Sequence, residues 1–179
     1  KAHLKLSQFN NTFSYRGKTW LKLYQTYVKP SLLYASEAWR PTTQELIEKL
    51  EGVQKRAMRM AGGMGDKNYR DACREAGMNL IREELDVSDM TRVYRIMYGR
   101  DKIEKSVLWK MEQAREGAGR KRFQEKEVTR TLATQRKEIQ KQSFASRIQD
   151  EWNNLSDGIK KARNPKAFRS SYKKATNLV

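Results

Sequence analysis

Apolar residues recur at three- and four-residue intervals along most of this 179-residue chain, and no stretch shows convincing period-two alternation. Intervals of three and four place side chains on one face of an α-helix, whereas a strand needs a period of two. Only 3 prolines and 10 glycines interrupt the chain, so long helices are possible. We therefore predict an all-α fold: a multi-helix bundle, a basic linker and a C-terminal helical module.

Residues 17–39 carry the clearest helical stripe. Its members are Trp20, Tyr24, Tyr27 or Val28, Ser31, Ala35 and Trp39. Pro30 lies in the middle of this stripe, and proline lacks an N–H and crowds the carbonyl four residues earlier. We therefore expect a kink or a break near Thr26–Lys29. At helical spacing, we expect the rings of Trp20, Tyr24, Tyr27, Tyr34 and Trp39 to pack in a core rather than stack on bases.

Start and stop signals delimit the helices that follow. Residues 42–45 read as a capping box with Thr42 at the N-cap and Glu45 three positions later. The helix behind it should bury Leu46, Leu50, Val53, Ala57 and Met60 and end at residues 62–63. We expect a short helix after Asp66 that ends at Gly77, and a longer one over about residues 80–98 that Gly99 closes.

Helical spacing returns near the end of the chain. Phe144, Ile148, Trp152 and Leu155 share one face, and Asn164-Pro165 is a helix start, an N-cap followed by proline at the first helical position. Residues 117–122 form a glycine-basic stretch with weak periodicity. We therefore predict a helical domain over residues 1–100, a basic linker or mobile loop over 101–130, and a C-terminal helical module over 131–179.

The charge balance points to a polyanionic partner. The chain has 38 Lys and Arg against 21 Asp and Glu, a net charge of +17, and a pI of about 10.1. Such a polycation binds phosphate independently of sequence, because counterions are released. No apolar run approaches the ~20 residues that a membrane span needs, so we predict no membrane partner. A single cysteine, Cys73, excludes an internal disulfide and suits a reducing compartment, so we expect an intracellular protein, nuclear and cytoplasmic.

The candidate nucleic-acid-binding residues fall into four groups. Lys18, Lys22, Lys29 and Arg40 flank the aromatic stripe, with a solvated face as the alternative. Lys55, Arg56 and Arg59 follow, although Glu45, Glu48 and Glu51 on the same predicted helix can pair with neighbours. The Arg120-Lys121-Arg122 patch suits a nucleic-acid arm, a nuclear-localisation signal or plain solubility. The acid-free tail favours nucleic acid and holds Lys160, Lys161, Arg163, Lys166, Arg169, Lys173 and Lys174.

No set of residues predicts catalysis within this chain. Glu83, Glu84, Asp86 and Asp89 lie on a predicted helix, where we expect a solvated acidic face rather than metal-binding aspartates on a hairpin. His3 is the only histidine and Cys73 the only cysteine, so a zinc site is not expected. Residues 62–65 lack the ending of a phosphate-binding loop and read as a helix stop. We predict no catalytic residue, no metal ligand and no cofactor here.

Three residue patterns, in order, resemble the thumb and C-terminal region of LINE-type (non-LTR, jockey-like) retrotransposon reverse transcriptases. The first contains Leu23, Tyr24, Val28, Pro30, Leu32 or Leu33, Tyr34, Ala35 and Trp39. The second, in the next predicted helix, contains Ile47, Leu50, Gln54, Ala57 and Arg59. The third contains Phe144, Arg147, Trp152, Asn153, Leu155, Phe168 and Arg169. Ser156 stands where that family usually has proline.

The resemblance implies a helical thumb that grips a template–primer, whether RNA template, DNA primer or hybrid duplex. It also implies a palm and fingers domain upstream in the same polypeptide, whose paired aspartates and Mg²⁺ would make the parent an RNA-directed DNA polymerase. About six phosphate contacts would give a log–log salt slope of about −5. Two alternatives remain open: a protein–protein scaffold derived from such a thumb that docks an acidic partner, and a histone-like or ribosome-associated binder.

Overall fold

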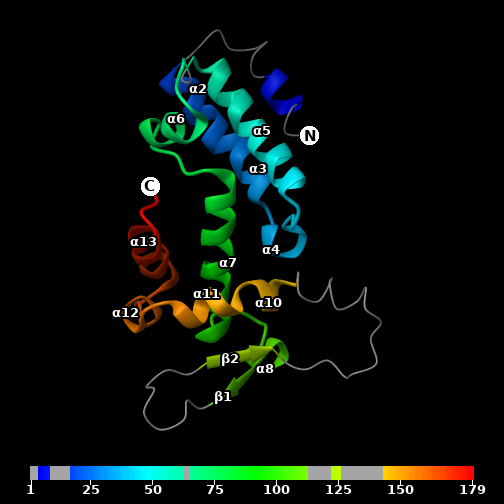
Figure 1. The fold of residues 1–179 in the computed structure, drawn as a ribbon, viewed down its shortest axis with the longest axis vertical. Helices are drawn as coiled ribbons and strands as arrows, with labels where there is room; N and C mark the ends of the chain where they lie inside the picture. Colours follow the sequence, from blue (N-terminus) through cyan, green and yellow to red (C-terminus); the bar gives the residue numbers. More distant parts are fainter. Residues whose placement is uncertain (1–3, 9–16, 63–64, 113–121, 126–142) are drawn as a thin grey trace. The chain divides into compact units, whose positions relative to one another are not determined.

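The computed structural model describes residues 4–8, 17–62, 65–112, 122–125 and 143–179, and its fold is all-α, as predicted (Figure 1). Residues 4–8 are helical, and they are followed by α2 (Lys18–Leu23), the π-helical turn η1 (Tyr24–Val28), α3 (Lys29–Leu33), α4 (Ser36–Trp39), α5 (Gln44–Met60), α6 (Tyr69–Glu75) and α7 (Ile81–Met97). The later ones are α8 (Lys105–Leu108), α10 (Phe144–Arg147), α11 (Gln149–Asn154), α12 (Asp157–Lys160) and α13 (Pro165–Ala175). Among the described residues no helix is long and apolar enough to cross a membrane.

The chain forms two compact units, which we describe separately. Unit 1 comprises Lys1–Asp86 and Asn177–Val179, and unit 2 comprises Val87–Thr176. The division falls inside α7, at a position that the sequence prediction did not mark. The predicted ranges 1–100, 101–130 and 131–179 stay predictions. Within 101–130 and 131–179, residues 113–121 and 126–142 lie outside the described part of the chain.

From α2 to α4, unit 1 buries every fourth residue, both before and after Pro30. Trp20, Tyr24, Val28, Leu32 and Ser36 are all at most 7% exposed. The chain widens into the π turn η1 just before Pro30, where the Lys29 N–H bonds to the carbonyl of Tyr24, five residues earlier. Because proline has no N–H for the Thr26 carbonyl, the regular ladder cannot continue there. The break predicted near Thr26–Lys29 is thus confirmed.

The predicted helical stripe is wrong after Val28. Leu32 and Ser36 are buried in place of Ser31, Ala35 and Trp39. Two local features explain the change: the π turn shifts the helical phase, and Ala35 takes a left-handed conformation (φ 51°) that separates α3 from α4. The rings of Trp20 and Tyr24 do pack in the core, whereas those of Tyr27, Tyr34 and Trp39 are 56, 79 and 43% exposed.

Helix α5 starts one residue later than the sequence predicted. Its N-cap is Thr43, without a side-chain cap hydrogen bond, so the capping box on Thr42 is wrong. The Glu45 carboxylate that should have closed the box instead accepts from Lys49 Nζ at 2.6 Å. Of the predicted inner face, Val53 and Ala57 are buried and Leu50 and Met60 are partly buried against the core, whereas Leu46 is 46% exposed. The buried face of α5 holds Glu51, Val53, Gln54, Ala57 and Met58.

Unit 2 is built around stacked aromatic rings. The Phe168 ring lies 4.6 Å from that of Tyr94, 5.9 Å from that of Trp152 and 6.2 Å from that of Tyr172, measured between centroids. The predicted start of α13 is confirmed, because the Asn164 side chain accepts from the Ala167 N–H at 2.8 Å. Such a capped helix presents its aromatic face to the core and its basic face to solvent.

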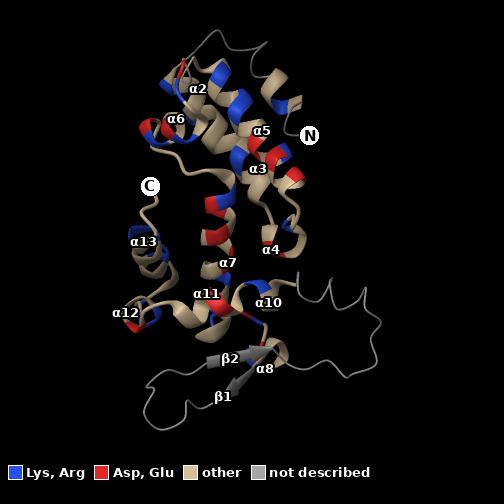
Figure 2. Ribbon diagram, viewed as in Figure 1, with Lys and Arg blue, Asp and Glu red and all other residues tan. Residues whose placement is uncertain are grey.

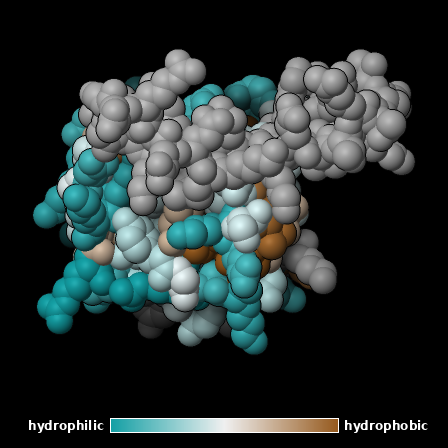
Figure 3. Space-filling view, turned by 90° about the horizontal axis from the view of Figure 1, so that it is seen from below, coloured by the Kyte–Doolittle hydropathy of each residue, from teal (hydrophilic) through white to brown (hydrophobic). Residues whose placement is uncertain are grey.

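A hairpin in unit 2 was not predicted. Strands β1 (Trp109–Glu112) and β2 (Arg122–Glu125) pair antiparallel, with Trp109 opposite Glu125. The Trp109 indole is buried and donates to the carbonyl of Ala145 at 3.1 Å. The hairpin lies in the range predicted as a linker, where apolar periodicity is weak. Some apolar side chains lie on the surface of the molecule. Figure 3 shows one face, on which brown apolar residues lie among teal hydrophilic ones.

Candidate nucleic-acid interface

Two pairs of exposed cations lie on neighbouring helices of unit 1. Lys18 and Lys22 are four residues apart on α2, and Arg56 and Arg59 are three apart on α5. The helices run antiparallel, since the Trp20 indole donates to the Ala57 carbonyl and the Gly17 N–H to that of Ala61, both at 3.0 Å (Figures 1 and 2). Within the described residues none of these four cations has a hydrogen bond or an ion pair.

Two of the predicted contacts are instead engaged inside unit 1. Lys29 Nζ lies 3.2 Å from Glu84 Oε1, with side chains 12 and 8% exposed. Arg40 forms an ion pair with Asp86. Glu84 and Asp86 therefore neutralise the charges with which Lys29 and Arg40 would otherwise bind a phosphate. Lys55 is half-buried and sits 5.1 Å from the centre of the Tyr69 ring, in a cation–π contact.

The acidic stretch at the start of α7 is not a solvated face, and that prediction was wrong (Figure 2). Glu83 accepts from the Leu80 N–H at 2.9 Å, as the third residue of a capping box does. Glu84 is buried against Lys29, and Asp86 pairs with Arg40. In unit 2, Asp89 is 1% exposed and accepts from Arg147 Nε at 2.8 Å. The cations come from distant parts of the chain, so local spacing could not reveal the pairs.

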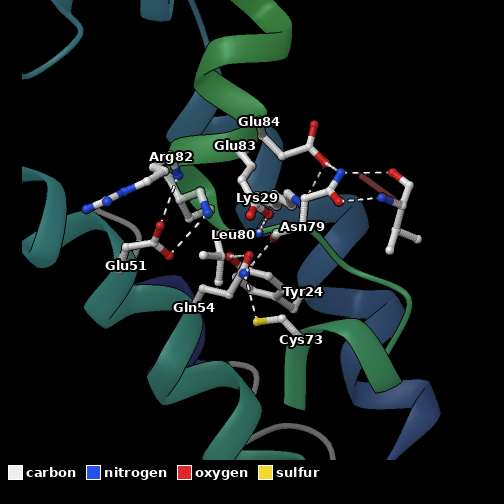
Figure 4. A network of polar contacts seen from close by, with 12 residues as sticks. Tyr24, Lys29, Glu51, Gln54, Cys73, Asn79, Leu80, Arg82, Glu83 and Glu84 are labelled. Atoms are coloured by element: carbon white, nitrogen blue, oxygen red, sulfur yellow. Dashed lines mark hydrogen bonds and ion pairs between the residues drawn. The ribbon is translucent and has the colours of Figure 1, made fainter. Parts of the chain in front are cut away.

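Gln54 is the centre of a buried polar network in unit 1 (Figure 4). Its carbonyl oxygen accepts from the Tyr24 hydroxyl at 3.0 Å, and its amide donates to the Asn79 carbonyl at 2.9 Å. The amide also lies 3.4 Å from Cys73 Sγ. Burial raises the pKa of the Cys73 thiol, which keeps it protonated and unreactive at neutral pH. Among the described residues no three His, Cys, Asp or Glu side chains are grouped as metal ligands would be.

Asn79 extends the network to the end of unit 1. Its amide donates to Glu84 Oε1 at 3.0 Å and to the Val179 carbonyl at 2.9 Å. Its side-chain oxygen accepts from the Val179 N–H at 2.7 Å. Asn79 thus pairs with the backbone of Val179 through both of its polar atoms, which holds residues 177–179 in unit 1.

Glu51 supplies the first turn of α7 with acceptors from another helix. Its carboxylate accepts from the N–H groups of Ile81 at 3.1 Å and Arg82 at 2.9 Å (Figure 4). It also accepts from the Tyr69 hydroxyl. A negative charge at a helix N-terminus is favourable, because the first N–H groups have no partner within the helix. Burial, then the hydrogen bond to Glu51, raises the pKa of Tyr69. The sequence analysis did not select Glu51, Gln54 or Asn79. Glu51 and Gln54 lie on the buried face of α5, and that position on the helix is the signal that could have identified them.

The predicted tail cations are divided between solvent and internal contacts. Lys161, Arg163, Lys166 and Lys174 are exposed, and their side chains form no hydrogen bond or ion pair with the described residues. Lys160 Nζ donates to the Asn153 carbonyl at 3.1 Å and lies over the Trp152 ring. Arg169 is exposed and Lys173 half-buried on α13. Arg122 lies in β2, and Arg120 and Lys121 lie outside the described residues.

Most of the charge excess belongs to unit 2. By sequence, unit 1 holds 15 Lys and Arg against 10 Asp and Glu, and unit 2 holds 23 against 11. In unit 1, α5 combines an acidic first half with a basic second half. The charge of unit 1 is therefore mixed, and the two exposed pairs are local features of α2 and α5 rather than part of a uniformly positive unit.

Comparison with protein-family models, with curated proteins and with solved structures finds no match to this chain. The resemblance to reverse-transcriptase thumbs therefore rests on the three residue patterns alone. The members of these patterns are divided between core and surface, and Tyr34 and Trp39 of the first pattern are exposed. Tyr24, Val28 and Leu32 from the first pattern, and Gln54 and Ala57 from the second, are buried in unit 1.

Proposed function

We propose that this chain is the nucleic-acid-gripping thumb and C-terminal part of a LINE-like reverse transcriptase, which binds a template–primer through its phosphates. The observation that supports this best is the set of four uncompensated cations on α2 and α5, which lie on two helices packed side by side. The ordered resemblance of three patterns supports the same function. Neither observation implies recognition of particular bases, as expected of a domain that holds a duplex by its phosphates.

The binding chemistry follows from the side chains that remain available. Lys18 and Lys22 supply ammonium groups, and Arg56 and Arg59 supply guanidinium forks that suit phosphate oxygens. Lys29 and Arg40 contribute little, because Glu84 and Asp86 neutralise them within unit 1. Four phosphate contacts correspond to a log–log salt slope of about −3.6, and each contact from unit 2 adds about −0.9. The expected total therefore lies near −5 when one or two tail cations take part.

Catalysis is assigned to the upstream palm and fingers domain of the same polypeptide. There, paired aspartates would hold the Mg²⁺ ions that activate and orient the reacting oxygens. The residues of this chain would hold the duplex in position and screen its phosphates. We therefore propose a positioning role for this chain, with no bond-making step of its own.

A salt titration tests the proposal directly. The chain is titrated with an RNA–DNA hybrid at several salt concentrations, and the slope of log K against log[salt] is measured. In a variant with Lys18, Lys22, Arg56 and Arg59 all replaced by Gln, the slope should become shallower by about 3.6. In the matched control, Lys49→Gln with Lys67→Gln removes two exposed cations that are already paired with Glu45 and Glu75. That control should keep the wild-type slope, whereas a wild-type slope near zero would reject the proposal.

A second candidate function has one observation in its favour. The rings of Tyr27, Tyr34 and Trp39 are exposed, and the Trp39 indole donates to the Tyr34 carbonyl at 2.6 Å, which fixes it on the surface. Tyr and Trp at exposed, fixed positions are typical of protein–protein interfaces. A scaffold that docks an acidic protein partner would bind polyglutamate as well as a hybrid duplex of equal charge. A thumb would strongly prefer the duplex.

A further inference from the structure

We infer that the end of α7 and the corner between α12 and α13 form a second phosphate-binding surface, in which Arg100 acts together with Arg163 and Lys166. We call these three residues the Arg100 ledge. The inference rests on the proposed function, because it assigns the ledge to the backbone phosphates of the same nucleic acid. It adds Arg100, which sequence reasoning did not select, and it assigns unit 2 a binding surface of its own.

A left-handed glycine sets the position of Arg100. Gly99 has φ +62° at the end of α7, a conformation that residues with a Cβ rarely adopt. The Arg100 N–H bonds to the Arg95 carbonyl at 2.8 Å and the Gly99 N–H to that of Ile96 at 3.2 Å. This is the Schellman arrangement, in which the bond that spans six residues encloses the shorter one. The backbone of Arg100 is therefore fixed by the helix that it follows.

The side chain of Arg100 then reaches the α12–α13 corner. Its Nη2 donates to the carbonyl of Arg163 at 3.0 Å. The neighbouring carbonyl, that of Ala162, accepts from the Tyr94 hydroxyl, and the Tyr94 ring stacks on Phe168 of α13. The corner is thus held by two donors from the α7 segment and by one ring stack. Its geometry is built into the core of unit 2.

Three cations lie on or beside this corner, and within the described residues none of their side chains forms an ion pair. The Arg100 guanidinium touches the backbone of a second arginine, and Lys166 follows three residues later in the first turn of α13. The side chains of Arg163 and Lys166 form no hydrogen bond or ion pair with the described residues. Nearby acids are engaged elsewhere: Asp101 pairs with Arg92 at 3.1 Å, and Glu151 accepts from Tyr172. Asp157 remains at the first turn of α12.

Backbone phosphate is the ligand that this chemistry favours. Like charges held on a fixed backbone repel each other, and an anion placed between them relieves the repulsion. The guanidinium fork offers five donors, and Arg100 uses one of its terminal nitrogens for the carbonyl of Arg163, so the remaining donors can bind phosphate oxygens. A carboxylate-bearing partner would compete less well, because two forks and an ammonium match the larger number of acceptors on a polyphosphate chain.

Single substitutions in the full chain test the ledge. Arg163→Gln is the cleanest variant, because its exposed side chain forms no hydrogen bond or ion pair with the described residues, so the melting temperature should not change. Arg100→Gln removes a donor to the corner as well as a charge. Arg95→Gln is the matched control: an exposed arginine on α7, five residues from Arg100, whose side chain has no described partner. The readout is the salt slope for an RNA–DNA hybrid, with the melting temperature recorded for each protein.

Arg163→Gln and Arg100→Gln should each make the slope shallower by about 0.9, while Arg95→Gln keeps the wild-type value. If wild type has a steep slope and Arg163→Gln and Arg100→Gln both keep it, the ledge is wrong and the proposed function stands. The ledge is also wrong if Arg95→Gln loses as much as they do, because net charge alone then explains the effect. A flat slope for wild type rejects the proposed function and the ledge with it.

Discussion

The two units of this chain hold their helices together by different means. Unit 1 places a hydrogen-bonded network at its centre, in which Glu51 and Gln54 of α5 reach α6, α7 and the segment between them. Unit 2 places aromatic rings there, with Phe168 in contact with Tyr94, Trp152 and Tyr172. Buried polar groups demand particular partners, whereas rings require shape and area. The two units should therefore respond to substitution in different ways.

The same contrast applies to charge. In unit 1 two of the predicted phosphate contacts, Lys29 and Arg40, serve as internal partners for acids on α7. In unit 2 Lys161, Arg163 and Lys166 keep their charges outward. The net charge of +17 therefore overestimates the number of cations that are available to bind phosphate, and it does so more in unit 1 than in unit 2. What decides the role of a cation is the partner that the fold gives it.

The largest effect is expected in the aromatic core of unit 2. Phe168→Ala removes a fully buried ring that touches three others, so the free energy of unfolding should fall by about 4 kcal/mol. Urea unfolding followed by circular dichroism measures this. Tyr34→Ala, at a 79% exposed ring in unit 1, is the control and should change stability by less than about 0.5 kcal/mol. A loss below about 1 kcal/mol for Phe168→Ala would show that the ring stack does not organise unit 2.

A slightly smaller effect is expected in the polar centre of unit 1. Glu51→Ala leaves two N–H groups of α7 and the Tyr69 hydroxyl without their acceptor, which should cost about 3 kcal/mol. Glu51→Gln retains one acceptor oxygen and should lose about half as much. Hydrogen exchange at the start of α7 should rise in both. Glu48→Ala, on the exposed side of the same helix, should leave exchange there unchanged; equal effects at the two positions would contradict the role of Glu51.

A matched pair of lysines separates internal from external cations. Lys29→Gln leaves Glu84 buried without its cation and should cost about 2 kcal/mol, while the salt slope of nucleic-acid binding keeps its wild-type value. Lys22→Gln should do the reverse, with stability unchanged and a slope shallower by about 0.9. Thermal unfolding and a salt titration on both proteins check this. If Lys29→Gln alone reduced the slope, the ion pair with Glu84 would not withhold Lys29 from phosphate.

Local signals predicted the helices and several of their ends. The Asn164-Pro165 start, the Gly99 stop and the break before Pro30 each depend on one or two residues whose backbone chemistry is independent of the rest of the fold. Helical spacing likewise placed Trp20, Tyr24 and Trp152 in the core. These features follow from periodicity and caps, which a sequence displays directly.

Contacts between distant residues could not be predicted in this way. Asp89 and Arg147 are 58 residues apart, and Glu51 meets the start of α7 about 30 residues later. Acidic residues on a helix look alike whether they meet water or a cation from elsewhere, so Glu84 and Asp89 were assigned to a solvated face. Arg100 was missed for the same reason, because its partner carbonyl at Arg163 lies 63 residues away. The sequence therefore predicted that basic residues form the candidate interface, but not which of them remain available to bind phosphate.

The smallest effect of a single substitution is expected at alkaline pH in unit 1. Burial raises the pKa of Tyr24 and Tyr69 in unit 1, with further contributions from Glu51. Unfolded tyrosines ionise near pH 10, so above that pH the unfolded chain releases protons that folded Tyr24 and Tyr69 keep. Stability is therefore complete below about pH 10 and falls above it, by about 1.4 kcal/mol per pH unit for each tyrosine. Tyr69→Phe should remove about half of this slope in urea unfolding between about pH 9 and 11. Tyr27→Phe, at a 56% exposed ring, should keep it, and an unchanged slope in Tyr69→Phe would mean that burial and the Glu51 contact do not hold the Tyr69 proton.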